Sequence, residues 1–157
     1  MGLTSVNIQS TLITEIPHSA FSDCDHLISV NIPESVIHIS SESFKGCSRL
    51  ASITIPPSVT KIWANVFEGC SQLKDVCIPS SVTYIAGYAF WECSGLRNMF
   101  VCHDNPSDIS LNSYAYLHKN PCVLWVPTGA KEKYLAADEW KEFKTIKEFT
   151  EANMNIG

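Results

Sequence analysis

The feature that most constrains the fold of this chain is a period of 23 residues. A block of one phenylalanine, one cysteine and one leucine returns at that interval in four units. The repeated positions are Phe21, Phe44, Phe67 and Phe90, Cys24, Cys47, Cys70 and Cys93, and Leu27, Leu50, Leu73 and Leu96. A unit of this length has too few apolar residues to form a core alone, so its copies must stack and bury their faces on one another. The period therefore predicts a solenoid with these residues in its core.

One unit of the repeat, from residue 50 to residue 73, shows how each coil should run. The alternation of Ile53, Thr54 and Ile55 is typical of a strand with one buried face. Pro56 then suits a corner, and the spacing from Phe67 to Leu73 predicts a short helical or 3₁₀ turn. Gly69, which ends this turn, indicates a left-handed backbone; the equivalent positions are Asp23, Gly46 and Glu92. We expect a right-handed solenoid of about five coils, with a parallel β-sheet on one side and short helical or 3₁₀ turns on the other.

The repeat also divides the chain, which we expect to be a single domain over residues 1–157. Residues 6–98 are regular 23-residue repeats, and residues 99–127 are degenerate final coils with a long loop. Residues 128–149 then form a C-terminal cap. Within the cap, Lys131 to Lys141 is rich in helix formers and predicts a capping helix, and Phe143, Ile146 and Phe149 are placed to add a short final strand.

The first coil has no polar capping segment ahead of it, although the end of a solenoid normally needs one. We therefore expect the natural chain to continue upstream, so that this sequence is a fragment of a longer one. An uncapped first coil also favours end-to-end association of two copies.

Composition excludes several classes of protein. The net charge of −5 argues against nucleic-acid binding, which needs a clustered basic face. The lysines after residue 130 alternate with acidic residues, as on a solvated helix face. No apolar run is long enough to span a membrane, and the first residues do not form a signal peptide.

Seven cysteines invite a disulfide framework or a metal site, but four of them follow the repeat. Equivalent side chains in a stack point the same way, whereas a disulfide needs facing geometry. A cysteine without a disulfide behaves as a small, often buried hydrophobic residue. We therefore expect buried thiols, and the cysteine count does not indicate a compartment.

Two copies of the unit carry a resemblance to a known family. They read VFEGCSQLKDVCIPSSVTYI over residues 66–85 and SFKGCSRLASITIPPSVTKI over residues 43–62. This unit resembles the bacterial leucine-rich repeat of the BspA type, also called the treponemal or fifth class. The ending LWVPTGAKEKYLAADEWKEFKTI, residues 124–146, is similar to the terminal coil and cap of such proteins. The resemblance implies a leucine-rich-repeat solenoid in a secreted or surface-exposed bacterial protein, often an adhesin or a binder of host proteins.

The outer surface of the predicted sheet supplies the first candidate binding site. Side chains between the inward positions should stand in rows along it. One row is Asn7, Asn31, Thr54, Cys77, Phe100 and Trp125, and its neighbour is Ser5, Ser29, Ser52, Asp75 and Asn98. Exposed aromatic residues often anchor protein interfaces, so we take Asn31, Thr54, Asp75, Cys77, Phe100 and Trp125 as candidate binding residues.

Packing inside the protein is the alternative explanation for both groups of aromatic residues. The loop from His103 to Pro121 could fold over Phe100 and Trp125 and bury them as additional core. A second aromatic group, Trp63, Tyr84, Tyr88 and Trp91, lies near the corner and turn of its coils, where packing between coils would explain it.

Catalytic and metal-binding patterns are weak. His103, Asp104, Cys102, His118 and Cys122 form one cluster of ligand types, but their spacing in an irregular loop matches no zinc pattern. The serines occupy turn positions, where local backbone hydrogen bonds explain them. No nucleophile motif or phosphate-binding loop is present. We therefore expect no enzyme activity, no metal and no cofactor.

The sequence thus predicts non-enzymatic recognition of a macromolecule, with adhesion or host-protein binding through the sheet face as the main hypothesis. The partner is expected to be a protein, with an extracellular protein of the host as the candidate and with neither nucleic acid nor a membrane span involved. The alternative is a structural spacer or end module of a larger surface protein. The localisation implied by the resemblance is extracellular or at the cell surface.

Overall fold

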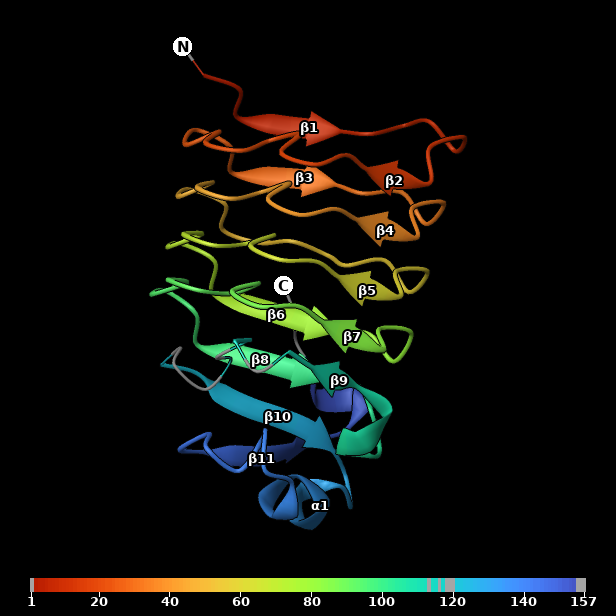
Figure 1. The fold of residues 1–157 in the computed structure, drawn as a ribbon, viewed down its shortest axis with the longest axis vertical. Helices are drawn as coiled ribbons and strands as arrows, with labels where there is room; N and C mark the ends of the chain where they lie inside the picture. Colours follow the sequence, from red (N-terminus) through yellow and green to blue (C-terminus); the bar gives the residue numbers. More distant parts are fainter. Residues whose placement is uncertain (1, 113, 116, 118–120, 155–157) are drawn as a thin grey trace.

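The computed structural model describes residues 2–112, 114, 115, 117 and 121–154. The chain winds into a stack of coils, with β1 at one end and α1 at the other (Figure 1). Every strand pairing among these residues is parallel. The predicted parallel solenoid is therefore confirmed.

The strands form two sides of the stack. The first side contains β1 (Ser5–Asn7), β3 (Ser29–Asn31), β6 (Asp75–Ile78), β8 (Asn98–Val101), β10 (Val123–Pro127) and β11 (Ile146–Phe149). The second side contains β2 (Glu15–Ile16), β4 (His38–Ile39), β5 (Lys61–Ile62), β7 (Tyr84–Ile85) and β9 (Ser110–Leu111). In the part of the chain that the structure describes, the helical elements are η1 (Pro106–Asp108), α1 (Lys131–Ala136) and η3 (Glu151–Asn153). The coils thus run past two sides that carry strands and a third side of turns, whereas we expected strands on one side.

The first side is interrupted in the middle. It consists of a two-stranded sheet, β1-β3, and a four-stranded sheet, β11-β10-β8-β6. The strand predicted at Ile53–Ile55 lies between them and is not a regular strand, although Ile53 and Ile55 are buried and Thr54 is exposed. The backbone bond to the following coil is long there, with 3.5 Å from the Lys74 N–H nitrogen to the Ala51 oxygen. The alternation of buried and exposed side chains was predicted correctly, but the regular strand predicted here was wrong.

The repeated phenylalanines form a continuous stack through the core. Ring centroids of Phe21 and Phe44 are 5.3 Å apart, those of Phe44 and Phe67 5.7 Å, and those of Phe67 and Phe90 5.2 Å. All but Phe21, which lies in the first coil, are fully buried. Stacked rings contribute beyond the area that they bury, so each coil is bound to the next by the same contact.

The repeated cysteines hydrogen-bond from coil to coil. The Cys47 thiol donates to the Phe21 carbonyl at 3.1 Å, Cys70 to Phe44 at 3.2 Å, and Cys93 to Phe67 at 3.1 Å. Because a thiol is a small apolar group and also a weak donor, it fills the core and still meets a buried carbonyl. None of the seven cysteines, all of which lie in the described residues, is in a disulfide.

The turns on the third side contain two left-handed residues in each regular coil. The first set is Ser19, Glu42, Asn65 and Tyr88, and the second is Asp23, Gly46, Gly69 and Glu92. We predicted the second set and missed the first, which contains no glycine. Amides in both sets donate to the following coil, for example Glu42 to the Ala64 oxygen at 3.0 Å and Gly46 to the Glu68 oxygen at 2.7 Å. The left-handed backbone therefore turns amides toward the next coil, which explains its recurrence.

The C-terminal segment closes the last coil. α1 is shorter than the predicted helix, and Tyr134 on it packs edge-on against Trp140, with ring centroids 5.2 Å apart. The Tyr134 hydroxyl donates to the His103 carbonyl at 3.0 Å. β11 then adds the expected final strand beside β10. Among the described residues, no helix has the length and apolar character that crossing a bilayer requires.

The first coil is the loosest part of the stack. Its apolar residues Val6, Ile8, Ile13 and Phe21 are only partly buried, and Leu12 is 89% exposed. Since no coil of the described chain lies beyond it, these side chains contact neighbours on one side only.

The phenylalanine stack leads to a stability prediction. Phe67→Ala should lower the free energy of unfolding by about 3–5 kcal/mol, because it leaves a cavity between two stacked rings. The matched variant Phe21→Ala should lower the free energy of unfolding by about half that amount or less, because Phe21 is partly exposed and stacks on one ring. Urea denaturation measures both values, and equal losses would contradict a core that is loosest in the first coil.

The buried thiols lead to a prediction about pH. Burial raises the pKa of Cys47 from 9.0 to about 12 and that of Cys93 to about 12. The unfolded chain ionises first as the pH rises, so stability from these thiols is complete below pH 9.0 and is lost toward their folded pKa. Between about pH 8 and about pH 10, Cys47 alone should account for a loss of about 1.4 kcal/mol in unfolding free energy. Urea titrations at the two pH values measure this. For Cys47→Ala the loss of unfolding free energy over this pH range should be smaller by about 1.4 kcal/mol than for the natural chain. The same pH dependence in both proteins would contradict the raised pKa of Cys47.

Candidate recognition surface

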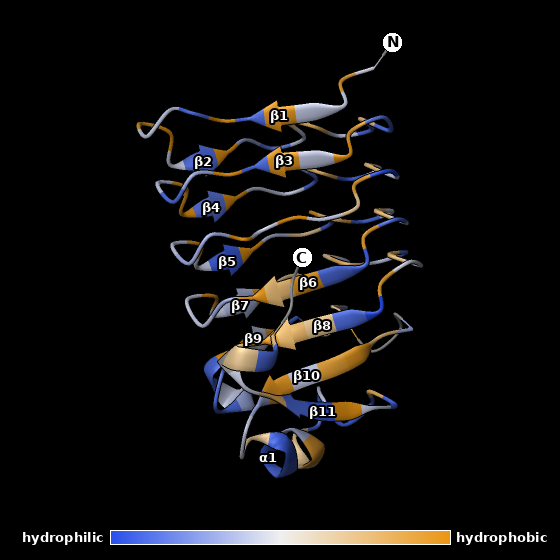
Figure 2. Ribbon diagram, turned by 180° about the vertical axis from the view of Figure 1, so that it is seen from behind, coloured by the Kyte–Doolittle hydropathy of each residue, from blue (hydrophilic) through white to orange (hydrophobic). Residues whose placement is uncertain are grey.

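The rows predicted on the outer face of the first side are present. Register pairs align Asn7 with Asn31 in β1 and β3, and align Cys77 with Phe100 and Phe100 with Trp125 across β6, β8 and β10. Asp75 lies beside Asn98 in the next row. Asn31 and Thr54 are exposed, and Asp75, Cys77 and Trp125 are half-buried. Figure 2 shows that β10 is apolar along most of its length, while β4 and β5 on the second side each combine one hydrophilic and one hydrophobic residue.

Phe100 is not the exposed anchor that we expected, since only 6% of it is accessible. The Trp125 ring stacks on it at 5.7 Å, and the Phe149 ring meets it edge-on at 5.7 Å. These two covering rings lie on β10 and on β11, which continues the sheet past β10. The sequence-based alternative placed the covering group in the loop between His103 and Pro121, of which the structure describes only part. The described part of that loop instead forms η1 and adds β9 to the second side.

Trp125 is held by polar contacts on the same face. Its indole N–H donates to the Asn98 amide oxygen at 2.8 Å, and the Asn98 amide nitrogen donates to Asp75 at 2.7 Å. The Lys147 ammonium lies 5.4 Å from the centre of the Trp125 ring, within the range of a cation–π contact. Stacked on Phe100 and covered by Lys147, this ring is part of the sheet's packing and offers little surface to a partner.

Exposed aromatic side chains gather instead on the second side and the turn that follows it. We call Trp63, Tyr84, Tyr88, Trp91 and Tyr114 the aromatic strip. Trp63 is 36% exposed, Tyr88 38% and Tyr114 53%, and the other two are half-buried. Tyr88 stacks on Tyr114 at 6.0 Å and meets Trp91 edge-on at 5.8 Å. The predicted packing between coils is present, but it leaves faces of the rings open to solvent.

Tyr88 occupies an unfavourable backbone conformation. Its φ of 60° lies in the left-handed region, where Asn65 occupies the equivalent position one coil earlier. A bulky side chain there is a genuine outlier that costs about 1–3 kcal/mol. The coil needs the left-handed turn, because the Tyr88 amide donates to the Tyr114 oxygen at 2.8 Å, but an asparagine would supply it at lower cost.

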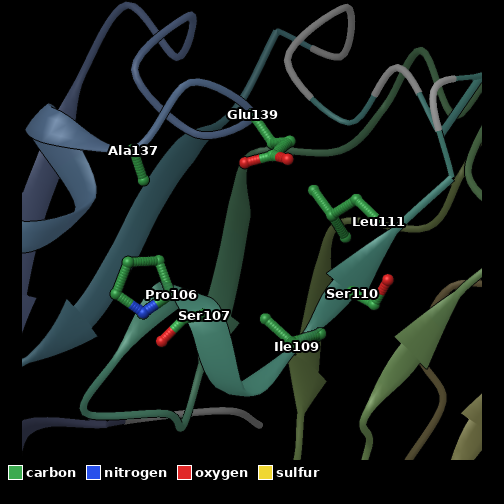
Figure 3. A pocket seen from close by; sticks show the side chains of 7 residues that line it. All are labelled: Pro106, Ser107, Ile109, Ser110, Leu111, Ala137 and Glu139. Atoms are coloured by element: carbon green, nitrogen blue, oxygen red, sulfur yellow. The ribbon is translucent and has the colours of Figure 1, made fainter.

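A shallow pocket adjoins the aromatic strip. Its volume is about 350 Å³, and it is lined by Pro106, Ser107, Ile109, Ser110, Leu111, Ala137 and Glu139 (Figure 3). Tyr84 of the strip pairs with Ser110 of the pocket across β7 and β9. The Glu139 carboxylate lies across the pocket from Ile109 (Figure 3). An acidic group above an apolar floor suits the long stem and charged end of a basic side chain.

The structure describes the cluster of ligand types in the loop only in part, through Cys102, His103, Asp104 and Cys122. The described residues contain no group of three or more histidine, cysteine or acidic side chains that could hold a metal ion. His103 is buried, with Nε2 2.7 Å from the Val82 oxygen, while its Nδ1 has no hydrogen-bond partner among the described atoms. Cys122 is buried, Asp104 is exposed, and His118 lies outside the described residues.

Sequence reasoning missed one feature of this surface. The Cys77 and Cys102 sulfurs lie 3.4 Å apart on neighbouring coils, and both side chains are half-buried. The signal was present in the sequence, since neither cysteine belongs to the 23-residue series.

Comparison with known proteins agrees with this architecture. The model of the BspA type leucine-rich repeat region matches residues 1–120 in six copies, one more than the five coils that we expected. Among curated proteins none matches the chain.

Two solved structures share the fold. A leucine-rich cell surface protein of Faecalibacterium prausnitzii superposes with a TM-score of 0.65 at 23% identity, over 96% of this chain and 34% of its own. The leucine-rich repeat protein of T. pallidum gives a TM-score of 0.57 at 26% identity, over 68% of this chain and 53% of its own. The chain therefore spans about a third and about half of the length of these structures. Because the repeat model covers most of the sequence, the chain belongs to the BspA-type leucine-rich repeat family.

Proposed function

We propose that this chain is a non-enzymatic recognition module of a bacterial surface protein, and that it binds a protein partner through the aromatic strip and the adjoining pocket. Adhesion, with an extracellular host protein as the partner, is the role that this surface would serve. The family supports protein recognition, and a surface location is suggested by the relative from Faecalibacterium prausnitzii, which is a cell surface protein.

The observation that carries the proposal is Tyr88. A bulky ring is kept in a left-handed turn, partly exposed, where a smaller residue would suit the fold better. Strain of this kind is retained where the side chain does something for which the fold alone gives no reason. Tyr114, which stacks on Tyr88, and Trp63, which packs edge-on against Tyr84, add exposed aromatic surface. Aromatic residues often carry binding energy in protein interfaces.

The charges at the two ends of the strip narrow the chemistry of the partner. At one end the Lys61 ammonium lies 5.4 Å from the centre of the Trp63 ring. At the other end Glu139 faces the pocket. A partner that places apolar or aromatic residues on the strip and a basic side chain in the pocket would complement both. Stacked coils hold these groups at fixed spacing, so little ordering is needed on binding.

The outer face of the first side remains a second contact area in this proposal. Its accessible part is polar, through Asn31, Thr54 and Asp75, with Cys77 and Trp125 half-buried. Self-association through the partly buried first coil is a separate proposal, and light scattering over a range of concentrations would measure it.

The binding proposal is tested by substituting Tyr88. Screening the chain against a panel of purified extracellular host proteins should identify a partner, and Tyr88→Asn should weaken its binding at least tenfold, as loss of an aromatic anchor does. The unfolding free energy should stay within about 1 kcal/mol, because relief of the left-handed strain offsets the lost ring contacts.

Glu42→Asn is the matched control, because Glu42 occupies the same left-handed position two coils earlier. It should leave binding unchanged, whereas Glu139→Gln should weaken binding to a partner with a basic contact. If no protein on the panel binds, or if Tyr88→Asn binds as well as the natural chain, the aromatic strip is not a recognition surface. The alternative function, a structural spacer in a larger surface protein, would then be favoured.

A further inference from the structure

Cys77 and Cys102 differ from the repeated cysteines in position. Cys77 stands in the outer row where earlier coils have Asn31 and Thr54. Cys102 stands at the corner position that Pro33, Pro56 and Pro79 occupy in the preceding coils. The repeat therefore requires a cysteine at neither place, yet the two departures meet on one face of the molecule.

Their sulfurs also differ in what they contact. The thiols of Cys47, Cys70 and Cys93 donate to backbone carbonyls inside the core. The Cys77 and Cys102 sulfurs instead contact each other at 3.4 Å, on the outer face and half-accessible to solvent. Cys102 immediately follows β8, where its amide still donates to the Ile78 oxygen at 3.0 Å. A disulfide bond of about 2.05 Å would require the two sulfurs to approach by about 1.4 Å.

We propose that Cys77 and Cys102 form a reversible disulfide, closed by exchange with a small-molecule disulfide and opened by a small-molecule thiol. The site is a redox-sensitive clasp between two neighbouring coils. It is a disulfide in an oxidising exterior and a dithiol in a reducing compartment. The inference does not depend on the recognition function, because the clasp lies on the first side and the aromatic strip on the second.

The exchange balances in two steps. The Cys102 thiolate attacks one sulfur of the external disulfide, forming a mixed disulfide and releasing one thiolate. Cys77 gives its proton to that thiolate and attacks the Cys102 sulfur, which releases the second thiolate; this takes up the proton that Cys102 lost earlier. Two S–H bonds are lost from the protein and one S–S bond forms, while the external disulfide is reduced to two thiols.

The electrostatics of the pair favour Cys102 as the attacking group. The pKa of Cys77 is raised by its hydrogen bond to Cys102, by burial, and by the negative charge that a Cys102 thiolate places beside it. The raised pKa holds the proton on Cys77, so we assign the attacking thiolate of the exchange to Cys102.

The test uses the whole chain and oxidised glutathione as the probe. Incubation of the reduced chain should lower its intact mass by two hydrogen atoms, without retained glutathione. Trypsin should then release the peptides 75–97 and 98–119 joined together. Because the first peptide also contains Cys93, a second digestion with chymotrypsin, which cuts between Cys77 and Cys93, should leave the link on Cys77.

Variants and stability complete the experiment. Cys77→Ser and Cys102→Ser should each abolish the link, whereas Cys24→Ser, which removes a half-buried thiol of the repeat series, should keep it. Oxidation should raise the folding equilibrium constant of the natural chain at least tenfold, as a cross-link between coils does. Stable glutathione adducts on either cysteine, a link to another cysteine, or an unoxidised pair would overturn the proposal, and the peptide map of the natural chain decides this even if a variant does not fold.

Discussion

Registry between neighbouring coils is the constraint on which the rest of this structure depends. Each regular coil donates amides from its left-handed turn residues to carbonyls of the following coil and, through its cysteine, a thiol to the preceding one. The same Phe44 carbonyl accepts from the Cys47 amide within its turn and from the Cys70 thiol of the next coil. A change in the length of one repeat would displace all of these pairs together, which explains why the interval stays at 23 residues through four units.

This registry separates residues that serve the fold from residues that do not. The inward positions of the repeated phenylalanine, cysteine and leucine keep the same residue from coil to coil, whereas positions that donate a backbone amide, such as Glu42 and Asn65, vary. Tyr88 shows the distinction within one residue, since its amide donates to the next coil while 38% of the residue, whose ring also packs on Tyr114 and Trp91, stays exposed. Cys77 and Cys102 lie where the ladder imposes no side chain, so their proximity needs another reason than the fold.

Most of the fold was predictable because the same pattern of apolar and turn residues recurs in several units. The buried phenylalanine, cysteine and leucine, the left-handed position at Gly69 and the final strand around Ile146 all follow from periodicity and backbone sterics. The left-handed position at Tyr88 was missed because no glycine marks it in any coil.

The candidate site was less predictable, since exposure depends on where distant parts of the chain return. Phe100 was placed in the correct row, but its burial depends on Phe149, a residue of the cap. The contact between Cys77 and Cys102 is diagonal across neighbouring coils, and the rule that equivalent side chains point the same way does not apply to it. The open faces of Tyr88 and Tyr114 likewise depend on how the irregular coil lies against β7.

Native-state hydrogen exchange, residue by residue, tests most directly whether coils are stabilised by their neighbours on both sides. The amides of Phe44 and Phe67, which donate to the following coil, should exchange only with global unfolding, and that of Phe21 in the first coil at least tenfold faster. Equal protection of all three amides, or the strongest protection at Phe21, would contradict this account, because it would mean that each coil is stable without the contacts that the repeat provides.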